Sequence, residues 1–311
     1  MIESAINPVG LPVPTNLATA TEQRERIGRS VDMSFSELES VPKPTQYRAI
    51  WISDVHLGTR ACNAAYLLDF LKHTDSETLY LVGDIVDGWR LKSAWYWPQT
   101  HNDVAQKLLR KARKGTRVLF VPGNHDEFAR PFVNHQFGGI EVHRDLIHET
   151  ADGRRLLIIH GDELDAVVQS AKWLAYIGDW AYRAAMVINV FFNLARKKLG
   201  YRYWSLSAYL KYKVKNAVAH IGKFEESVAG LARERGADGV VCGHIHHPEV
   251  REIGGILYAN DGDWVESCTA LVEHDDGRLE LLRWTQPLTE RHAAGQGIES
   301  IPFAAGVTAR A

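Results

Sequence analysis

The chain has 311 residues, of which 45% are hydrophobic, and it carries a formal net charge of -2. This composition is typical of a globular protein with a large buried core, and the near-neutral charge gives no general attraction to nucleic acid. The three cysteines, Cys62, Cys242 and Cys268, follow no metal-binding spacing and favour a reducing compartment over a disulfide framework. We therefore expect a cytoplasmic protein with no nucleic-acid partner, whose oligomeric state the sequence leaves open.

Both ends of the chain have compositions typical of segments outside a folded core. Residues 1–45 carry Pro8, Pro12, Pro14, Pro42 and Pro44 among polar residues, which indicates a disordered arm. We expect no secretory signal in this arm, because no basic segment precedes an apolar one. Residues 286–311 are rich in glycine and alanine and predict a flexible tail. The folded domain is therefore predicted to cover residues 46–285.

From residue 46 to about 165, strand-like and helical patterns alternate. Strands are predicted in the runs RAIWIS (48–53), LYLVG (79–83) and RVLFVPG (117–123). Helices are predicted between them, in AAYLLDFLKHT (64–74) and DVAQKLLRKARKG (103–115). This alternation favours an α/β fold with helical crossovers between strands, which places ligand-binding groups at the carboxyl ends of the strands.

Residues 166–235 break this rhythm and predict a helical cap insertion that is rich in aromatic and basic residues. The aromatic residues at helical spacing are explained either as the core of the insertion or as a cleft for acyl chains. In the second interpretation, Arg196, Lys197 and Arg202 form a basic rim that binds substrate and contacts a membrane surface. Strands then return at 239–243 and 256–260, followed by a hairpin over 269–284 that turns at Asp276–Gly277.

Five short polar motifs directly follow predicted strands. They are DVH (54–56), GDIVD (83–87), GNHD (123–126), HGDE (160–163) and GHIHH (243–247). Aspartate, asparagine and histidine supply oxygen and nitrogen ligands that suit manganese, iron, zinc or magnesium. One chance match would mean little, but five motifs in the same position after strands predict a metal centre.

The motifs divide into ligands for two cations that share one carboxylate. Residues two apart in an extended segment point to one face, so we expect Asp54 with His56, and His244 with His246, to project together. The predicted ligands of the first cation are Asp54, His56, Asp84 and His246, and those of the second are Asp84, Asn124, His160 and His244. Such a pair of cations activates a bridging water and binds phosphate oxygens.

Further residues in the motifs have predicted roles around these ligands. His125 lies beside Asn124 and is predicted to protonate a leaving group, with Asp126 orienting its imidazole. Asp87 and Asp162 are predicted to orient ligating histidines. Arg60 and Arg90 follow the first two motifs and are either phosphate contacts or surface residues.

These motifs, in this order, resemble those of the calcineurin-like metallophosphoesterases over about residues 48–275. The resemblance implies a four-layer αββα sandwich with two metals at the sheet edge, here with the helical cap as an insertion. The HGDE motif and the position of the insertion are most similar to the UDP-2,3-diacylglucosamine pyrophosphohydrolase group, which prefers manganese. Members of that group carry arginine at the position of His125, which is a departure of this chain from the group's pattern.

Three functions follow from this resemblance as hypotheses. The first is hydrolysis of UDP-2,3-diacylglucosamine to UMP and 2,3-diacylglucosamine 1-phosphate by a metal-bridging hydroxide, at the inner face of the cytoplasmic membrane. The second is hydrolysis of another phosphodiester or monoester on a nucleotide or phospholipid, which His125 in place of arginine favours. The third is a non-catalytic scaffold of the same fold, which the complete set of ligands argues against.

Overall fold

The computed structural model describes residues 43–164, 221–287, 290 and 297–302. The chain divides into two compact units after Lys43. All the elements described below belong to the unit that starts at Pro44. Residues 1–42 of the predicted arm (1–45) and residues 166–220 of the predicted cap insertion (166–235) therefore lie outside the described residues. The domain boundaries expected from the sequence stay predictions.

The first sheet has eight strands in the order β13-β12-β11-β1-β2-β3-β5-β4. Its centre is parallel, because β1 pairs with β2, β2 with β3, and β3 with β5 in the same direction. The strand bounds are β1 Thr45–Ile52, β2 Thr74–Leu81, β3 Arg117–Phe120, β4 Gln136–Phe137, β5 Ile140–Val142, β11 Thr269–Glu273, β12 Leu279–Arg283 and β13 Glu299–Ile301.

The second sheet has five strands in the order β6-β7-β8-β10-β9. Strands β7, β8 and β10 run parallel, while β6 and β9 pair antiparallel at the two edges. The strand bounds are β6 Leu146–Glu149, β7 Arg155–Ile158, β8 Gly239–Cys242, β9 Glu249–Ile253 and β10 Ile256–Asn260.

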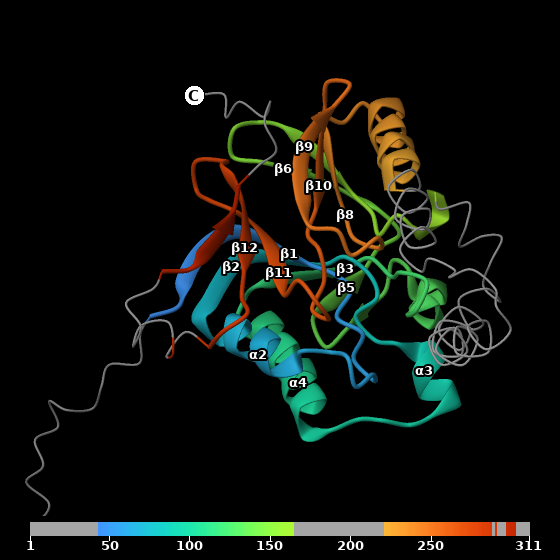
Figure 1. Cartoon of the computed structure of the whole chain (residues 1–311), viewed down its shortest axis with the longest axis vertical. Coiled ribbons are helices and arrows are strands. Elements are labelled where there is room, and N and C mark those ends of the chain that lie inside the picture. The colour runs from blue at the N-terminus through green and yellow to red at the C-terminus, as the bar shows by residue number, and fades with distance from the viewer. Residues whose placement is uncertain (1–42, 165–220, 288–289, 291–296, 303–311) are drawn as a thin grey trace, which may run out of the picture. The chain divides into compact units, whose positions relative to one another are not determined.

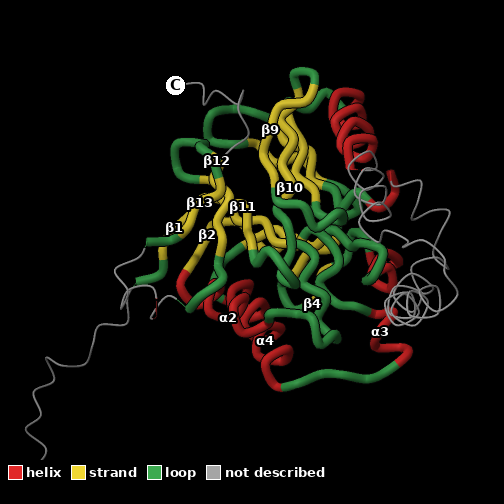
Figure 2. Tube along the Cα trace, in the orientation of Figure 1, coloured by secondary structure: helices red, strands yellow, loops and turns green. Residues whose placement is uncertain are grey.

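Three apolar clusters hold these sheets between helices (Figures 1 and 2). The outer face of the first sheet packs against α2 (Ala64–His73) and α4 (Gln99–Arg113) through residues such as Phe70 and Leu108. The two sheets face each other across a second cluster that includes Trp51 and Val241. A third cluster joins the outer face of the second sheet to the helical residues 221–234. The αββα architecture predicted from the sequence is therefore confirmed for the described residues.

The helical residues 221–234 are the part of the predicted cap insertion that the structure describes as a helix. They fall inside the predicted cap insertion, yet Phe224, Val228 and Ala232 are buried against the second sheet. Their apolar spacing is that of a helix packed on the sandwich, and the sequence pattern alone does not distinguish this from a cap helix. The end of the predicted insertion is thus the outer helical layer of the fold.

The remaining short elements are α3 (Gly88–Ser93) and η2 (Glu127–Phe132), which follow the motifs at 83–87 and 123–126, and η3 (Asp162–Leu164), which begins within the motif at 160–163. All three cysteines are free thiols. In the described ranges, no helix combines the length and the apolar character needed to cross a bilayer.

The Phe70 side chain offers a direct test of the helix–sheet core. It is fully buried, and its ring centroid lies 5.3 Å from those of Trp264 and Trp284. Replacing Phe70 by alanine should lower the free energy of unfolding by about 3–5 kcal/mol, because the cavity is walled by rigid rings. Urea denaturation measures this loss. The matched Phe137→Ala variant alters a side chain that is 52% exposed and should lose under about 1 kcal/mol; equal losses would contradict this core.

Candidate metal centre

The five polar motifs come together because the strands that precede them end at one edge of the sandwich. Asp54 follows β1, Asp84 follows β2, Asn124 follows β3, His160 follows β7 and His244 follows β8. Parallel strands in each sheet bring their carboxyl ends to the same side, and the packing of the two sheets brings those sides together. Both sheets therefore contribute ligands to one site.

The backbone at this edge is left-handed rather than extended. Positive φ angles between 50° and 71° occur at five of the seven predicted ligands: Asp54, His56, Asp84, His244 and His246. The expectation that ligands two residues apart share an extended segment is therefore wrong. The segments after β1 and β2 continue side by side, joined by hydrogen bonds such as the one from Asp54 N–H to Gly83 O (3.0 Å) and by a parallel bridge between Leu57 and Val86. Residues other than glycine rarely adopt this backbone conformation. The backbone strain that it causes is concentrated at functional sites in proteins.

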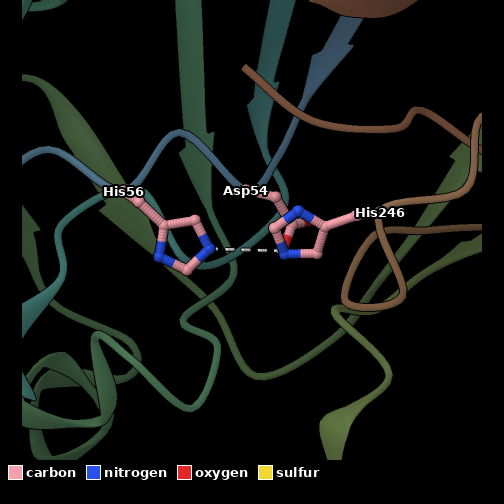
Figure 3. A group of neighbouring side chains, drawn as sticks. All are labelled: Asp54, His56 and His246. Carbon is pink, nitrogen blue, oxygen red and sulfur yellow. Dashed lines mark ion pairs between the residues drawn. The ribbon is translucent and has the colours of Figure 1, made fainter. Parts of the chain in front are cut away.

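The first group of potential ligands consists of Asp54, His56 and His246, whose ligand atoms lie within 4.8 Å of one another. The Nε2 atom of His246 is 3.2 Å from Oδ1 of Asp54, and Nε2 of His56 is 3.9 Å from the same oxygen. Figure 3 shows both imidazoles directed at the Asp54 carboxylate. These are three of the four residues predicted to bind the first cation.

The second group consists of Asp84, His160 and His244, and its ligand atoms also lie within 4.8 Å of one another. Oδ2 of Asp84 is 3.4 Å from Nε2 of His160 and 3.9 Å from Nε2 of His56. Asp84 thus faces both groups, which is the position that a carboxylate shared by two cations requires.

The histidines present one nitrogen to the groups and the other to the surrounding protein. Three Nδ1 atoms have an oxygen within 3.4 Å outside the groups: Asp87 for His56, the Val82 carbonyl for His160, and Asp263 for His246. Such partners hold the proton on Nδ1, so the lone pair of Nε2 points inward. This tautomer is assigned from the geometry of the contacts.

The inward atoms fit a cation because they are buried and lack other partners. In the described part of the chain, no hydrogen bond reaches Oδ1 of Asp54, Nε2 of His56, Oδ1 of Asn124 or Nε2 of His160. A buried polar atom without a partner costs about 1–3 kcal/mol, and this cost falls here on the predicted ligand atoms. A divalent cation in each group would satisfy them together.

Without a cation, protons must balance the charges in these groups. Burial lowers the pKa of His246, but the negative charge of Asp54 outweighs this and raises that pKa to about 10. The pKa of His160 is likewise raised, because the charge of Asp84 overcomes the effect of burial. Cation binding would displace these protons, so metal affinity is expected to fall as pH falls.

The imidazole of His125 is oriented by Asp87 rather than by Asp126. Its Nδ1 is 3.1 Å from Oδ1 of Asp87, and its Nε2 is 4.0 Å from Oδ2 of Asp84. Burial lowers the pKa of His125, but the hydrogen bond to Asp87 and the charge of Asp84 give a net rise. His125 therefore stands beside the shared carboxylate with one ring nitrogen turned toward it.

Asp126 has a different place from the one expected. Its carboxylate is fully buried and accepts hydrogen bonds from the backbone of Gly123 (2.5 Å) and Ile85 (2.7 Å). Burial and the charge of Asp84 raise the pKa of Asp126 to about 6. Adjacency in sequence suggested an orienting role, but the backbone turns between the two residues, and Asp126 ties the GNHD loop to the loop after β2.

The remaining predicted residues that the structure describes, Arg60, Arg90 and Asp162, belong to neither ligand group. Arg60 is exposed, and its guanidinium lies 4.7 Å from the ring centroid of Tyr96. Arg90 is exposed in α3. Asp162 pairs with Arg130 at 2.6 Å instead of orienting a histidine. Phosphate contacts from either arginine stay predictions, and Arg196, Lys197 and Arg202 lie outside the described residues.

Sequence reasoning missed a second line of acids after β10. Asp263 contacts His246, and Ser53 bridges Asp54 to the buried Asp261 with hydrogen bonds of 2.6 Å and 2.5 Å. The signal was present, since the run NDGDW (260–264) directly follows the apolar run ILYA, as the other motifs follow their strands. It contains no histidine, which made it look like an ordinary turn.

Gly123 makes the close approach of these ligands possible and provides a test. A Cβ atom there would lie 2.4 Å from Oδ1 of Asp84 and 2.6 Å from the His160 ring. Gly123→Ala should therefore separate these side chains and lower the bound metal, measured by elemental analysis after dialysis, by at least about half. Gly230→Ala is the control, because no atom lies within 4 Å of its added Cβ. Equal metal content in the two variants would contradict the assigned site.

Comparison with known proteins places this geometry in a family. The sequence pattern of calcineurin-like phosphoesterases matches residues 47–248. The UDP-2,3-diacylglucosamine hydrolase of Azotobacter vinelandii is 28% identical over 212 residues, covering 65% of this chain and 83% of that protein. The enzyme of the same name from Xanthomonas campestris pv. campestris is 28% identical over 264 residues, covering 75% and 98%. That from Neisseria meningitidis serogroup B is 24% identical over 249 residues, covering 74% and 96%. All five polar motifs lie within the matched residues, and the chain belongs to the calcineurin-like phosphoesterase family of metal-dependent hydrolases.

Proposed function

We propose that this chain hydrolyses UDP-2,3-diacylglucosamine to UMP and 2,3-diacylglucosamine 1-phosphate. The reaction would use two divalent cations, and manganese is the metal that we propose for both. The hydrolytic part is supported by two neighbouring ligand groups, in which Asp84 of one group lies 3.9 Å from His56 of the other, and by their buried ligand atoms without partners. The substrate is supported by the relatives named UDP-2,3-diacylglucosamine hydrolase, which match most of the chain. A lipid substrate of this kind would place the enzyme at the inner face of the cytoplasmic membrane.

The described residues would hold the cations in two groups around Asp84. Asp54, His56 and His246 would complete one site, and Asn124, His160 and His244 the other. Bound there, the cations would lower the pKa of a water molecule and neutralise charge on the phosphate oxygens. The protein contributes fixed geometry, because Asp87, Asp263 and the Val82 carbonyl prevent the ligating imidazoles from turning.

His125 would move a proton in this reaction. Its Nδ1 is paired with Asp87, so its Nε2 is the atom that can donate to a leaving oxygen. The ring is half-buried at the edge of the groups, where a phosphate bound between the cations would expose its leaving group. UMP is a good leaving group and needs little help from an acid.

The pairing of His125 with Asp87 favours a second substrate class. A positioned acid beside the cations matters most for an ester whose leaving alkoxide or phenoxide must be protonated. Hydrolysis of a phosphodiester or monoester is therefore the second candidate. A non-catalytic scaffold that binds no metal is disfavoured. Buried ligand atoms without partners would only destabilise such a protein.

Replacing Asp84 by alanine tests the shared-carboxylate assignment. Turnover of UDP-2,3-diacylglucosamine with added manganese should fall at least about 10²-fold, because one transition-state charge contact is lost. Bound manganese, measured by elemental analysis, should fall in parallel. Asp103→Ala removes an exposed carboxylate on α4 that accepts a hydrogen bond from Gln99 Nε2 (2.7 Å), and it should leave both values unchanged.

The same assay compares the two substrate classes. Release of UMP that depends on Asp84 would support the first candidate. Cleavage of bis-p-nitrophenyl phosphate without release of UMP would reject the lipid substrate and keep the metal chemistry. Near-normal turnover of either compound by Asp84→Ala would reject the two-cation site.

A further inference from the structure

We propose that Trp89 is a positioning residue for His125, holding the imidazole in the orientation from which its Nε2 reaches a leaving oxygen. The inference rests on the proposed hydrolytic function, and it adds a residue that lies outside the ligand groups. We also expect Trp89 to widen the range of substrates. Poor leaving groups must be protonated as they leave, and Trp89 acts on this protonation through His125.

The geometry begins with the imidazole, which is enclosed on three sides. The indole of Trp89 lies against it with ring centroids 4.2 Å apart and an interplanar angle of 39°. On another side, the His56 ring meets it edge-on at 4.6 Å. Asp87 holds its Nδ1 at 3.1 Å. Its Nε2 faces Asp84, with 4.0 Å to Oδ2 of that carboxylate.

Trp89 is itself held in place from two directions. Its Nε1 donates a hydrogen bond of 3.2 Å to Glu127, the first residue of η2. The backbone N–H of Gly88, the preceding residue, donates to the carbonyl of His125 at 2.9 Å. The first turn of α3 is thus tied to the residue that it supports, and the indole does not depend on its own packing alone.

Gly88 shows how closely α3 approaches this loop. A Cβ atom there would lie 3.0 Å from the carbonyl oxygen of His125 and 2.9 Å from the ring of Phe128. The absence of a side chain lets the helix begin directly beside His125. Asp87 accepts from the backbone of Arg90 and so caps this helix, while it also holds His125. One turn of chain therefore supplies both the carboxylate contact and the aromatic wall.

The wall matters because one carboxylate contact at Nδ1 does not fix a ring. An imidazole held only at Nδ1 can pivot about that contact and tilt Nε2 away from the leaving oxygen. An aromatic face packed on the ring opposes this tilt. An acid must come within about 2.6–3.2 Å of the oxygen that it protonates, and a misplacement of about 1 Å costs on the order of 10²-fold in rate.

The test compares leaving groups in Trp89→Leu. With diphenyl phosphate, whose phenoxide needs a proton, turnover should fall about 10²-fold, the contribution typical of a general acid. With bis-p-nitrophenyl phosphate, whose p-nitrophenolate leaves unaided, it should fall less than about threefold on the same argument. Trp89→Phe keeps an aromatic face and should recover most of the loss. Trp95→Leu removes an indole that is 77% exposed and should match the wild type with both esters.

A double substitution separates positioning from simple destabilisation. If Trp89 acts through His125, Trp89→Leu should cause no further loss of diphenyl phosphate turnover in a His125→Asn background. Equal losses for both esters, or a full additional loss in that background, would overturn the proposal. Bound manganese in Trp89→Leu should equal that of the wild type, and a drop would assign Trp89 to metal binding instead.

The design also separates this inference from the proposed function. The aryl esters report on His125 whether or not UDP-2,3-diacylglucosamine is a substrate. A wild type that cleaves the aryl esters and releases no UMP would reject the lipid substrate, and the comparison of leaving groups would still decide the role of Trp89.

Discussion

The structure depends on one electrostatic constraint, which is the burial of two carboxylates that face the same small space. Asp54 is fully buried and Asp84 is 2% exposed, and the charge of each opposes ionisation of the other. Imidazoles offset this repulsion only if they are protonated, whereas divalent cations offset it with the imidazoles neutral. The sandwich is the frame that brings these carboxylates from two neighbouring strands to one edge. The first sheet also supplies His56, and the second sheet supplies His160, His244 and His246.

Around this centre, the protein fixes rings by their outer nitrogens. Asp87 contacts both His56 and His125, so one carboxylate orients a residue of the first group and the proposed acid. Asp126 holds the GNHD loop through backbone amides instead. Both carboxylates come from polar motifs that look alike in sequence, but one supports side chains and the other supports the main chain. The proposed role of Trp89 belongs to the first kind of support.

The sequence predicted the architecture and the convergence of the motifs because both follow from local patterns: apolar strands, helical crossovers, and polar residues where the strands end. It did not predict the backbone at the ligands, since a left-handed turn leaves no mark on periodicity. It assigned the orientation of His125 to the neighbouring Asp126, although the contact is made by Asp87, which comes from another strand. It missed Asp261 and Asp263 for the same reason, because their partners are distant in the chain.

The left-handed turns have a consequence for how such a protein can change over generations. Each turn at Asp54, His56, Asp84, His244 or His246 holds a side chain in a conformation that costs about 1–2 kcal/mol relative to glycine. A lineage released from selection for catalysis could replace these residues and become more stable as it does so. Loss of catalysis with retention of the fold is therefore expected to raise the free energy of unfolding.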